Sequence, residues 1–256
     1  MLMDWIDRFK SLKSNPVGPD IANASWTSFT LSGTEIRFKC PLHEIASELQ
    51  ATSQTLDIYR DDLYEHPWNE ADISMSASLR HSGWKLWSNS FKEEPIGDLS
   101  FSILLTKCHP NYRKIDSLFK PADIQNWILE YCDSGWGELN RELRGDDNDG
   151  MDILTYPRSA GDIQRTSING QAWYSYSAQG IGGGKTIIWN FPISDSHALM
   201  FQFQPTPITR NYNEPENYLD DLAEKTVQEF MSHVHVKLSP DAQQRCDKVK
   251  SENQAS

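Results

Sequence analysis

The feature that most constrains the fold is the tetrapeptide Ile168-Asn169-Gly170-Gln171, which lies between two stretches typical of β-strands. Asn-Gly tolerates the positive φ angles of a type I′ turn, and the twist of that turn matches two antiparallel strands. The pattern therefore predicts a meander with strands near residues 162–168, 171–178, 185–193 and 197–204. Its inner face would consist of Ile187, Trp189, Phe191, Leu199, Phe201 and Phe203.

Two earlier segments also predict strands. Residues 29–38 alternate between apolar and polar side chains on either side of Ser32-Gly33, which predicts a hairpin with one solvent-facing side. Residues 98–106 place large apolar side chains on one face and mostly hydroxyl side chains on the other, which predicts a well-buried strand.

Three segments have the spacing of amphipathic helices. The first covers residues 2–12. The second opens at Pro121, a residue that suits the first turn of a helix, and Asp133-Ser134-Gly135 is expected to end it. The third is a long helix that Asn213 and Glu216 would open, with apolar residues from Leu219 to Met231 on one side.

Together these elements predict the α+β class, with an antiparallel sheet (a hairpin plus a C-terminal meander) and helices packed on it. We expect residues 1–238 to form a single domain. Residues 239–256 are polar and are expected to form a disordered tail.

Composition limits the partners. The formal net charge is −12 and the pI is about 5.0, which opposes nucleic acid or an anionic membrane as the main partner. The N-terminal residues lack the apolar core of a secretory signal, so we expect a cytoplasmic protein. The four cysteines are far apart in sequence and predict neither a zinc site nor a disulfide framework.

The glycine-rich segment Gln179-Gly180-Ile181-Gly182-Gly183-Gly184-Lys185-Thr186 resembles a phosphate-binding loop but lacks its spacing. Gln179 stands where the first glycine of that loop belongs. Residues 186–191 predict a strand after the loop, whereas phosphate loops lead into a helix. We therefore expect a loop between two strands, with no nucleotide cofactor.

Other motifs also lack a required residue, so no metal site or cofactor is expected. His43-Glu44 begins like the zinc motif H-E-x-x-H, but Ser47 replaces the second histidine. Residues 145–150 resemble a calcium loop, but Gly145 replaces the first ligand. Asp195 and His197 flank a turn and could assist a hydroxyl group, although no nucleophile motif accompanies them.

A family resemblance follows from the order of elements. A hairpin reading FTLSGTEIRFKCP, a strand reading LSFSILLTKC, a helix, the segment INGQAW, a meander and a final helix together resemble the PsbP-like fold over residues 26–238. The resemblance implies an antiparallel sheet between helices that is used for docking proteins and has no shared catalytic centre. It transfers no functional residue.

The leading functional hypothesis is a non-catalytic protein-binding protein, such as an adaptor, a chaperone or an immunity protein that neutralises a toxin. Its partner should be a protein with a basic surface. The alternatives are a hydrolase whose site is assembled from distant residues, and a module that binds carbohydrate or another small ligand through Trp84 and Trp87. The candidate partner-binding residues are the aromatic Trp84, Trp87 and Trp136 and the acidic Asp146, Asp147 and Asp149.

Overall fold

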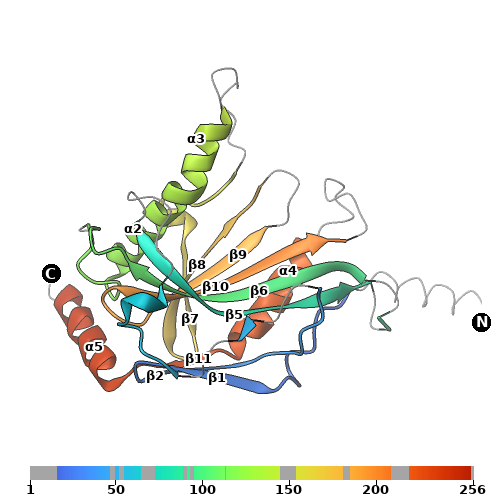
Figure 1. The fold of residues 1–256 in the computed structure, drawn as a ribbon, viewed down its shortest axis with the longest axis horizontal. Helices are drawn as coiled ribbons and strands as arrows, with labels where there is room; N and C mark the ends of the chain where they lie inside the picture. The colour runs from blue at the N-terminus through green and yellow to red at the C-terminus, as the bar shows by residue number, and fades with distance from the viewer. Residues whose placement is uncertain are drawn as a thin grey trace, which may run out of the picture.

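The computed structural model of the chain describes residues 16–46, 50–51, 55–64, 73–88, 91–92, 95–112, 114–144, 154–180, 185–208 and 219–254. These residues form two sheets, with helices packed against them (Figure 1). The predicted α+β class with an antiparallel sheet is confirmed. The predicted N-terminal helix at residues 2–12 lies outside the described residues.

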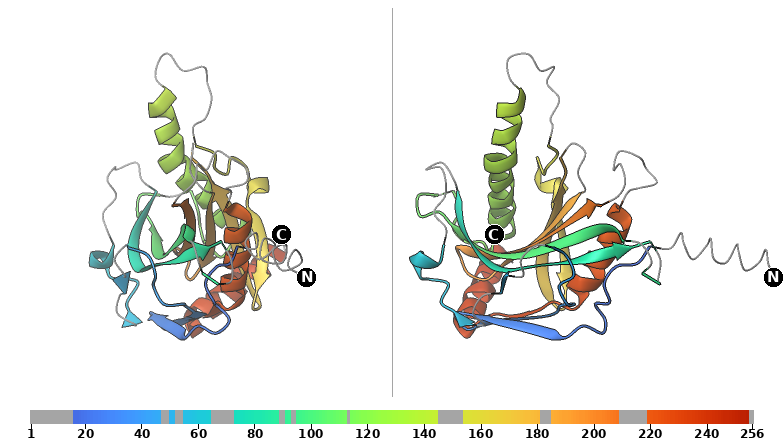
Figure 2. Two further views of the ribbon diagram at one scale, coloured as in Figure 1. Left: turned by 90° about the vertical axis from the view of Figure 1, so that its right-hand side faces the viewer. Right: turned by 45° about the vertical axis from the view of Figure 1, so that its right-hand side comes forward.

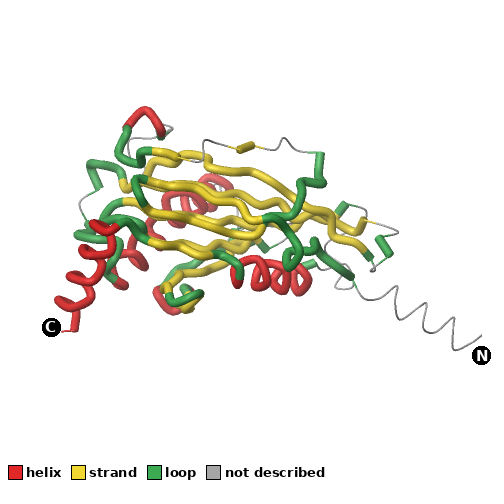
Figure 3. Tube along the Cα trace, turned by 90° about the horizontal axis from the view of Figure 1, so that it is seen from below, coloured by secondary structure: helices red, strands yellow, loops and turns green. Residues whose placement is uncertain are grey.

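The larger sheet has seven strands in the order β3-β5-β6-β10-β9-β8-β7, and every neighbouring pair is antiparallel. Figure 3 shows strands of this sheet lying side by side. The predicted meander is confirmed as β7 to β10, and β10 continues the sheet by pairing with β6. The strands are β3 (Gln50–Ala51), β5 (Ser74–Trp87), β6 (Pro95–Cys108), β7 (Gln164–Ile168), β8 (Gln171–Ala178), β9 (Thr186–Pro192) and β10 (His197–Pro207).

The turn between β7 and β8 has the predicted conformation. Asn169 has φ of 49° and Gly170 has φ of 81°, as a type I′ turn requires. This turn pairs Ile168 with Gln171 and so fixes the register of the whole hairpin.

The smaller sheet has four strands in the order β11-β2-β1-β4. Its centre is the predicted hairpin, which turns at Ser32 and Gly33, both with positive φ. The other two strands are short and come from distant parts of the chain. The strands are β1 (Trp26–Leu31), β2 (Thr34–Lys39), β4 (Thr55–Leu56) and β11 (His235–Lys237).

Apolar side chains cover both faces of the larger sheet. On one face, α4 (Asp220–Ser232) and the smaller sheet enclose an aromatic core in which Phe101 lies 4.7 Å from Phe230 between ring centroids. On the other face, α2 (Pro121–Cys132) packs through Ile124, Trp127 and Ile128. The predicted long C-terminal helix is not confirmed, because α4 has 13 residues, and Asn213 and Glu216 lie outside the described residues.

The prediction that Asp133-Ser134-Gly135 ends the second helix is wrong. The backbone continues through a π-helical segment (Asp133–Gly137) into α3 (Glu138–Arg144), and Figure 2 shows the three as one rod that rises away from the sheet. Tertiary contacts hold the segment, because the Asp133 carboxylate accepts hydrogen bonds from Arg141 and from the Tyr156 hydroxyl group. Two 3₁₀ turns complete the described elements, at Asp61–Leu63 and Ala160–Asp162.

The prediction of a disordered tail is also wrong. Residues Pro240–Gln254 form α5, which lies at one end of the larger sheet. The Ser239 hydroxyl group accepts a hydrogen bond from the Ala242 amide at 3.3 Å and so caps the helix. Cys246 and Val249 are buried against the core, which anchors α5.

Candidate functional site

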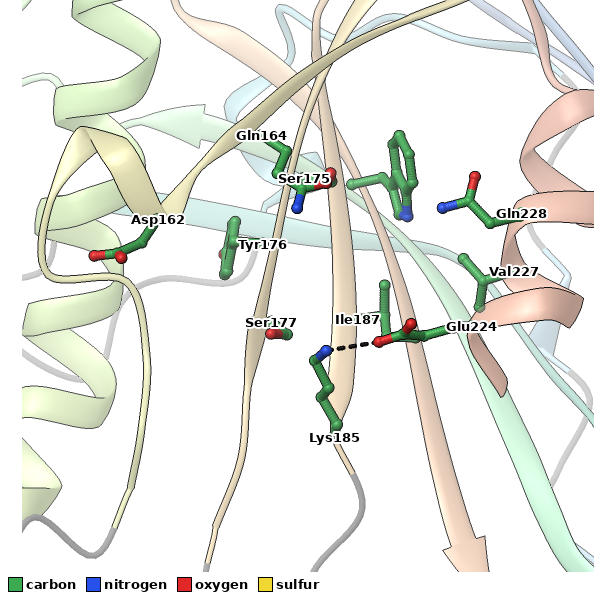
Figure 4. Close-up of a pocket in the computed structure, with 11 residues that line it drawn as sticks. Asp162, Gln164, Ser175, Tyr176, Ser177, Lys185, Ile187, Glu224, Val227 and Gln228 are labelled. Atoms are coloured by element: carbon green, nitrogen blue, oxygen red, sulfur yellow. Dashed lines mark hydrogen bonds and ion pairs between the residues drawn. The ribbon is translucent and has the colours of Figure 1, made fainter. Parts of the chain in front are cut away.

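A groove lies between α4 and the last three strands of the larger sheet, and we name it the β7–α4 groove (Figure 4). It has a volume of about 160 Å³. It exists because α4 does not cover the sheet as far as its edge at β7. The lining side chains include Gln164, Ser175, Ser177, Lys185, Ile187, Trp189, Glu224 and Gln228.

Strand register positions the floor of the groove. Gln164 of β7 pairs with Ser175 of β8, which pairs with Trp189 of β9, so these three residues lie in one row across the sheet. Ser177 and Ile187 form the next row. On α4, Glu224 and Gln228 are one helical turn apart and face the same side. The groove therefore has a mixed floor, in which Trp189 and Ile187 are apolar and the other side chains carry hydroxyl or amide groups.

An ion pair crosses the groove. The Lys185 ammonium group lies 2.6 Å from the Glu224 carboxylate, and Figure 4 shows the two side chains facing each other. The Lys185 amide also donates a hydrogen bond to the Asp220 carboxylate at 3.2 Å. The lysine of the glycine-rich segment thus pairs with a carboxylate of α4. Residues 181–184 lie outside the described part of the chain.

Trp189 leaves one hydrogen-bond donor unused. Its side chain is 2% exposed and lines the groove, and its indole N–H has no partner within the described residues. An unpaired buried donor costs free energy that an acceptor from a bound molecule would recover. The groove therefore suits a polar group that accepts a hydrogen bond and lies against an aromatic ring.

The groove opens beside the free edge of β7. In a hairpin with a two-residue turn, the two residues that flank the turn form a hydrogen-bonded pair. Hydrogen-bonded pairs then alternate with pairs whose backbone N–H and C=O groups point away from the partner strand. Arg165 and Ser167 are the outward residues. Their N–H and C=O groups have no partner among the described residues. Residues Gln164, Arg165, Thr166 and Ser167 are exposed, so this edge is accessible.

The turn between β9 and β10 contains a serine and a histidine in contact. The Ser194 hydroxyl oxygen lies 2.7 Å from His197 Nδ1 and also accepts hydrogen bonds from the amides of Ser196 and His197. Burial, followed by the charge of Lys107, lowers the pKa of His197 from 6.5 to about 4, which makes it a weak base. Neither Ser194 nor His197 lines the β7–α4 groove.

Asp195 of the same turn does not orient the histidine. Its carboxylate binds the Arg245 guanidinium group at 2.9 Å and accepts a hydrogen bond from Ser117. A serine nucleophile requires a base and a third group that orients this base. The hydrogen bonds of this cluster instead hold the turn against α5, and we interpret it as structural.

The predicted partner-binding tryptophans do not form one patch. Trp84 is fully buried and stacks on Phe101, so the prediction that it is a surface anchor is wrong. Trp87 is half-buried near the cations of Lys85 and Lys92. Trp136 is half-buried on the face of the larger sheet opposite Trp84, beside a cavity of about 60 Å³. Asp146, Asp147 and Asp149 lie outside the described residues.

Sequence reasoning missed the residues of the groove. Ser175, Trp189 and Glu224 come from three elements, and no local motif connects them. The Asn-Gly turn does fix the pairing of Gln164 with Ser175. The position of α4 over β9 depends on tertiary packing, which the sequence pattern does not specify.

Within the described residues, no group of three or more His, Cys, Asp or Glu side chains is arranged to hold a metal ion. Among the helices that the structure describes, none combines the length and apolar composition needed to cross a bilayer. The sequence matches no protein-family model, and no curated protein is significantly similar to it.

Proposed function

We propose that this chain is a non-catalytic protein-binding protein and that its partner adds an extended segment to the free edge of β7. The observation that carries the proposal is the unpaired backbone of Arg165 and Ser167 beside the β7–α4 groove. Edge strands bind extended segments through main-chain hydrogen bonds, and neighbouring pockets select the side chains. Successive side chains of such a segment point to opposite faces, so every second one would face the groove.

Charge favours a basic partner. The chain has a formal net charge of −12, and α4 begins with Asp220 and Asp221 next to the groove. A lysine or arginine of the partner that entered the groove would compete with Lys185 for the Glu224 carboxylate. Long-range attraction increases the rate of encounter and weakens with salt, so we expect association to slow as ionic strength rises.

The free edge has a structural explanation as well. Short, polar edge strands protect folded proteins from aggregation, and β7 is both short and polar. Such a strand still pairs with a segment whose side chains match the adjacent surfaces. The groove supplies that specificity, which an edge that is only protective does not need.

The wider proposal keeps the classes that the sequence suggests, namely an adaptor, a chaperone or a toxin-neutralising immunity protein in the cytoplasm. The PsbP-like resemblance agrees with a protein-docking role. Trp87, Trp136 and the acidic residues Asp146, Asp147 and Asp149 remain candidate contacts outside the groove. The unused indole N–H of Trp189 favours a second candidate, a module that binds a small polar ligand in the same groove.

The test is quantitative affinity capture from the source cell, with three forms of the chain as bait. Ser167→Pro removes one outward N–H donor but leaves the bonds between β7 and β8 intact, since proline is tolerated at such edge positions. Ser167→Ala removes the side chain and keeps the donor. We expect the wild type and Ser167→Ala to recover one stoichiometric protein, and Ser167→Pro to bind it about tenfold more weakly, ~1.4 kcal/mol.

Glu224→Gln provides the test of charge, with Glu229→Gln as the matched control on the same helix. The first should slow association and reduce its dependence on salt, whereas the second should leave both unchanged. Equal recovery by all the variants would contradict binding at β7. Absence of any stoichiometric protein, together with turnover in a hydrolase screen, would favour the enzyme alternative.

A further inference from the structure

A second cavity lies at the end of the larger sheet where α5 meets β7 and β8, and we name it the β7–α5 pocket. Its volume is about 230 Å³, larger than that of the β7–α4 groove. Its walls are largely apolar or aromatic. They include Phe119, Pro121, Tyr174, Phe191, Leu238 and Cys246.

The charged side chains of this pocket are both positive. Arg165 of β7 and Lys250 of α5 line it, and no Asp or Glu is among its described lining residues. Neither cation forms an ion pair within the described part of the chain.

The pocket has further features that suit an anion. The charge of Arg165 opposes the effect of burial on the pKa of Tyr174, so the guanidinium group lies near this phenol. Pro121, the first residue of α2, adds an apolar ring to the wall beside this phenol.

We propose that the β7–α5 pocket binds a small carboxylate with an apolar body. The apolar walls would take the body, and Arg165 and Lys250 would hold the carboxylate at the mouth. Since one water molecule occupies about 30 Å³ in the liquid, the pocket suits a ligand of on the order of ten non-hydrogen atoms. This inference is independent of the proposed binding at β7, because it concerns the opposite face of the strand and a different class of ligand.

The test is isothermal titration calorimetry of the full chain with octanoate, below its micelle concentration. 1-Octanol lacks the charge, octylamine reverses it, and acetate lacks the apolar body. We expect saturable binding of octanoate, at least about fivefold weaker binding of 1-octanol (~1 kcal/mol), and no binding of octylamine or acetate.

Variants then locate the site. Arg165→Gln and Lys250→Gln should each weaken octanoate binding about fivefold, whereas Lys225→Gln on α4 should not change it. Both pocket residues are exposed, so the variants should fold, and circular dichroism checks this. No saturable octanoate binding, equal binding of 1-octanol or acetate, or binding unchanged by both pocket variants would each overturn the proposal. The outcome of the capture experiment with Ser167→Pro does not depend on the result with octanoate.

Discussion

His197 should make the stability of this protein depend on pH. Its side chain is 2% exposed and packs against the rings of Tyr59 and Tyr64. Ser194 already accepts two backbone hydrogen bonds, so its own proton is available for Nδ1, which fits a neutral imidazole. Protonation would place a charge in this buried position near the Lys107 ammonium group.

The direction of the pH dependence follows from the pKa of His197 in the folded chain and in the unfolded chain. Burial lowers the pKa of His197 to about 4 in the folded chain, against 6.5 for an ordinary histidine. The unfolded chain therefore binds a proton first as pH falls, and stability decreases from about pH 6.5 down to about pH 4. Linkage gives a loss of about 2 kcal/mol between pH 7.5 and pH 5.0, and roughly 3 kcal/mol for the whole shift.

The assay is urea unfolding at pH 7.5 and 5.0 for the wild type and for His197→Gln, with His235→Gln as an exposed control. Between pH 7.5 and pH 5.0, the free energy of unfolding of the wild type and of the control should decrease by about 2 kcal/mol more than that of His197→Gln. NMR titration of the wild type checks the mechanism directly. Equal losses in all three proteins, or a folded His197 that titrates near 6.5, would refute the reasoning.

Three further predictions concern the fold and use the free energy of unfolding as the measurement. Trp189→Ala should cost roughly 3–5 kcal/mol because the side chain is buried in a central strand, and a loss under ~1 kcal/mol would contradict this packing. Gly170→Ala should cost about 1 kcal/mol because φ is 81° there, whereas Gly161→Ala, with room for a Cβ, should cost less. Val249→Ala should cost about 2 kcal/mol if α5 is docked. An unchanged free energy of unfolding would instead indicate that the residues after Ser239 are disordered.

Short sequence patterns were sufficient to predict the turns and strands that depend on residues close together in the chain. The Asn-Gly and Ser-Gly turns fix two hairpins, because positive φ at consecutive residues admits few alternatives. The meander follows from its alternating side chains. These elements also determine part of the groove, since the pairing of Gln164 with Ser175 follows from the turn at Asn169.

Tertiary contacts determine the two segments that the sequence predicted wrongly. The sequence Asp133-Ser134-Gly135 is typical of a helix end. In the structure, the contacts of Asp133 with Arg141 and Tyr156 stabilise a helical backbone that continues through these residues. The segment after Ser239 reads as disordered because it is polar, yet two buried side chains and an N-cap are enough to dock α5. Short helices gain most of their stability from such packing, which a single sequence does not display.

The measurement that tests the central claim most directly is amide hydrogen exchange at β7, with and without the partner recovered by the wild-type chain. In the free protein, the amides of Arg165 and Ser167 should exchange fast, whereas those of Thr166 and Ile168 should be protected by their bonds to β8. When the partner adds a strand, Arg165 and Ser167 should become protected. If both amides still exchange at the free rate in a saturated complex, the partner does not bind at the edge of β7 and the account is contradicted.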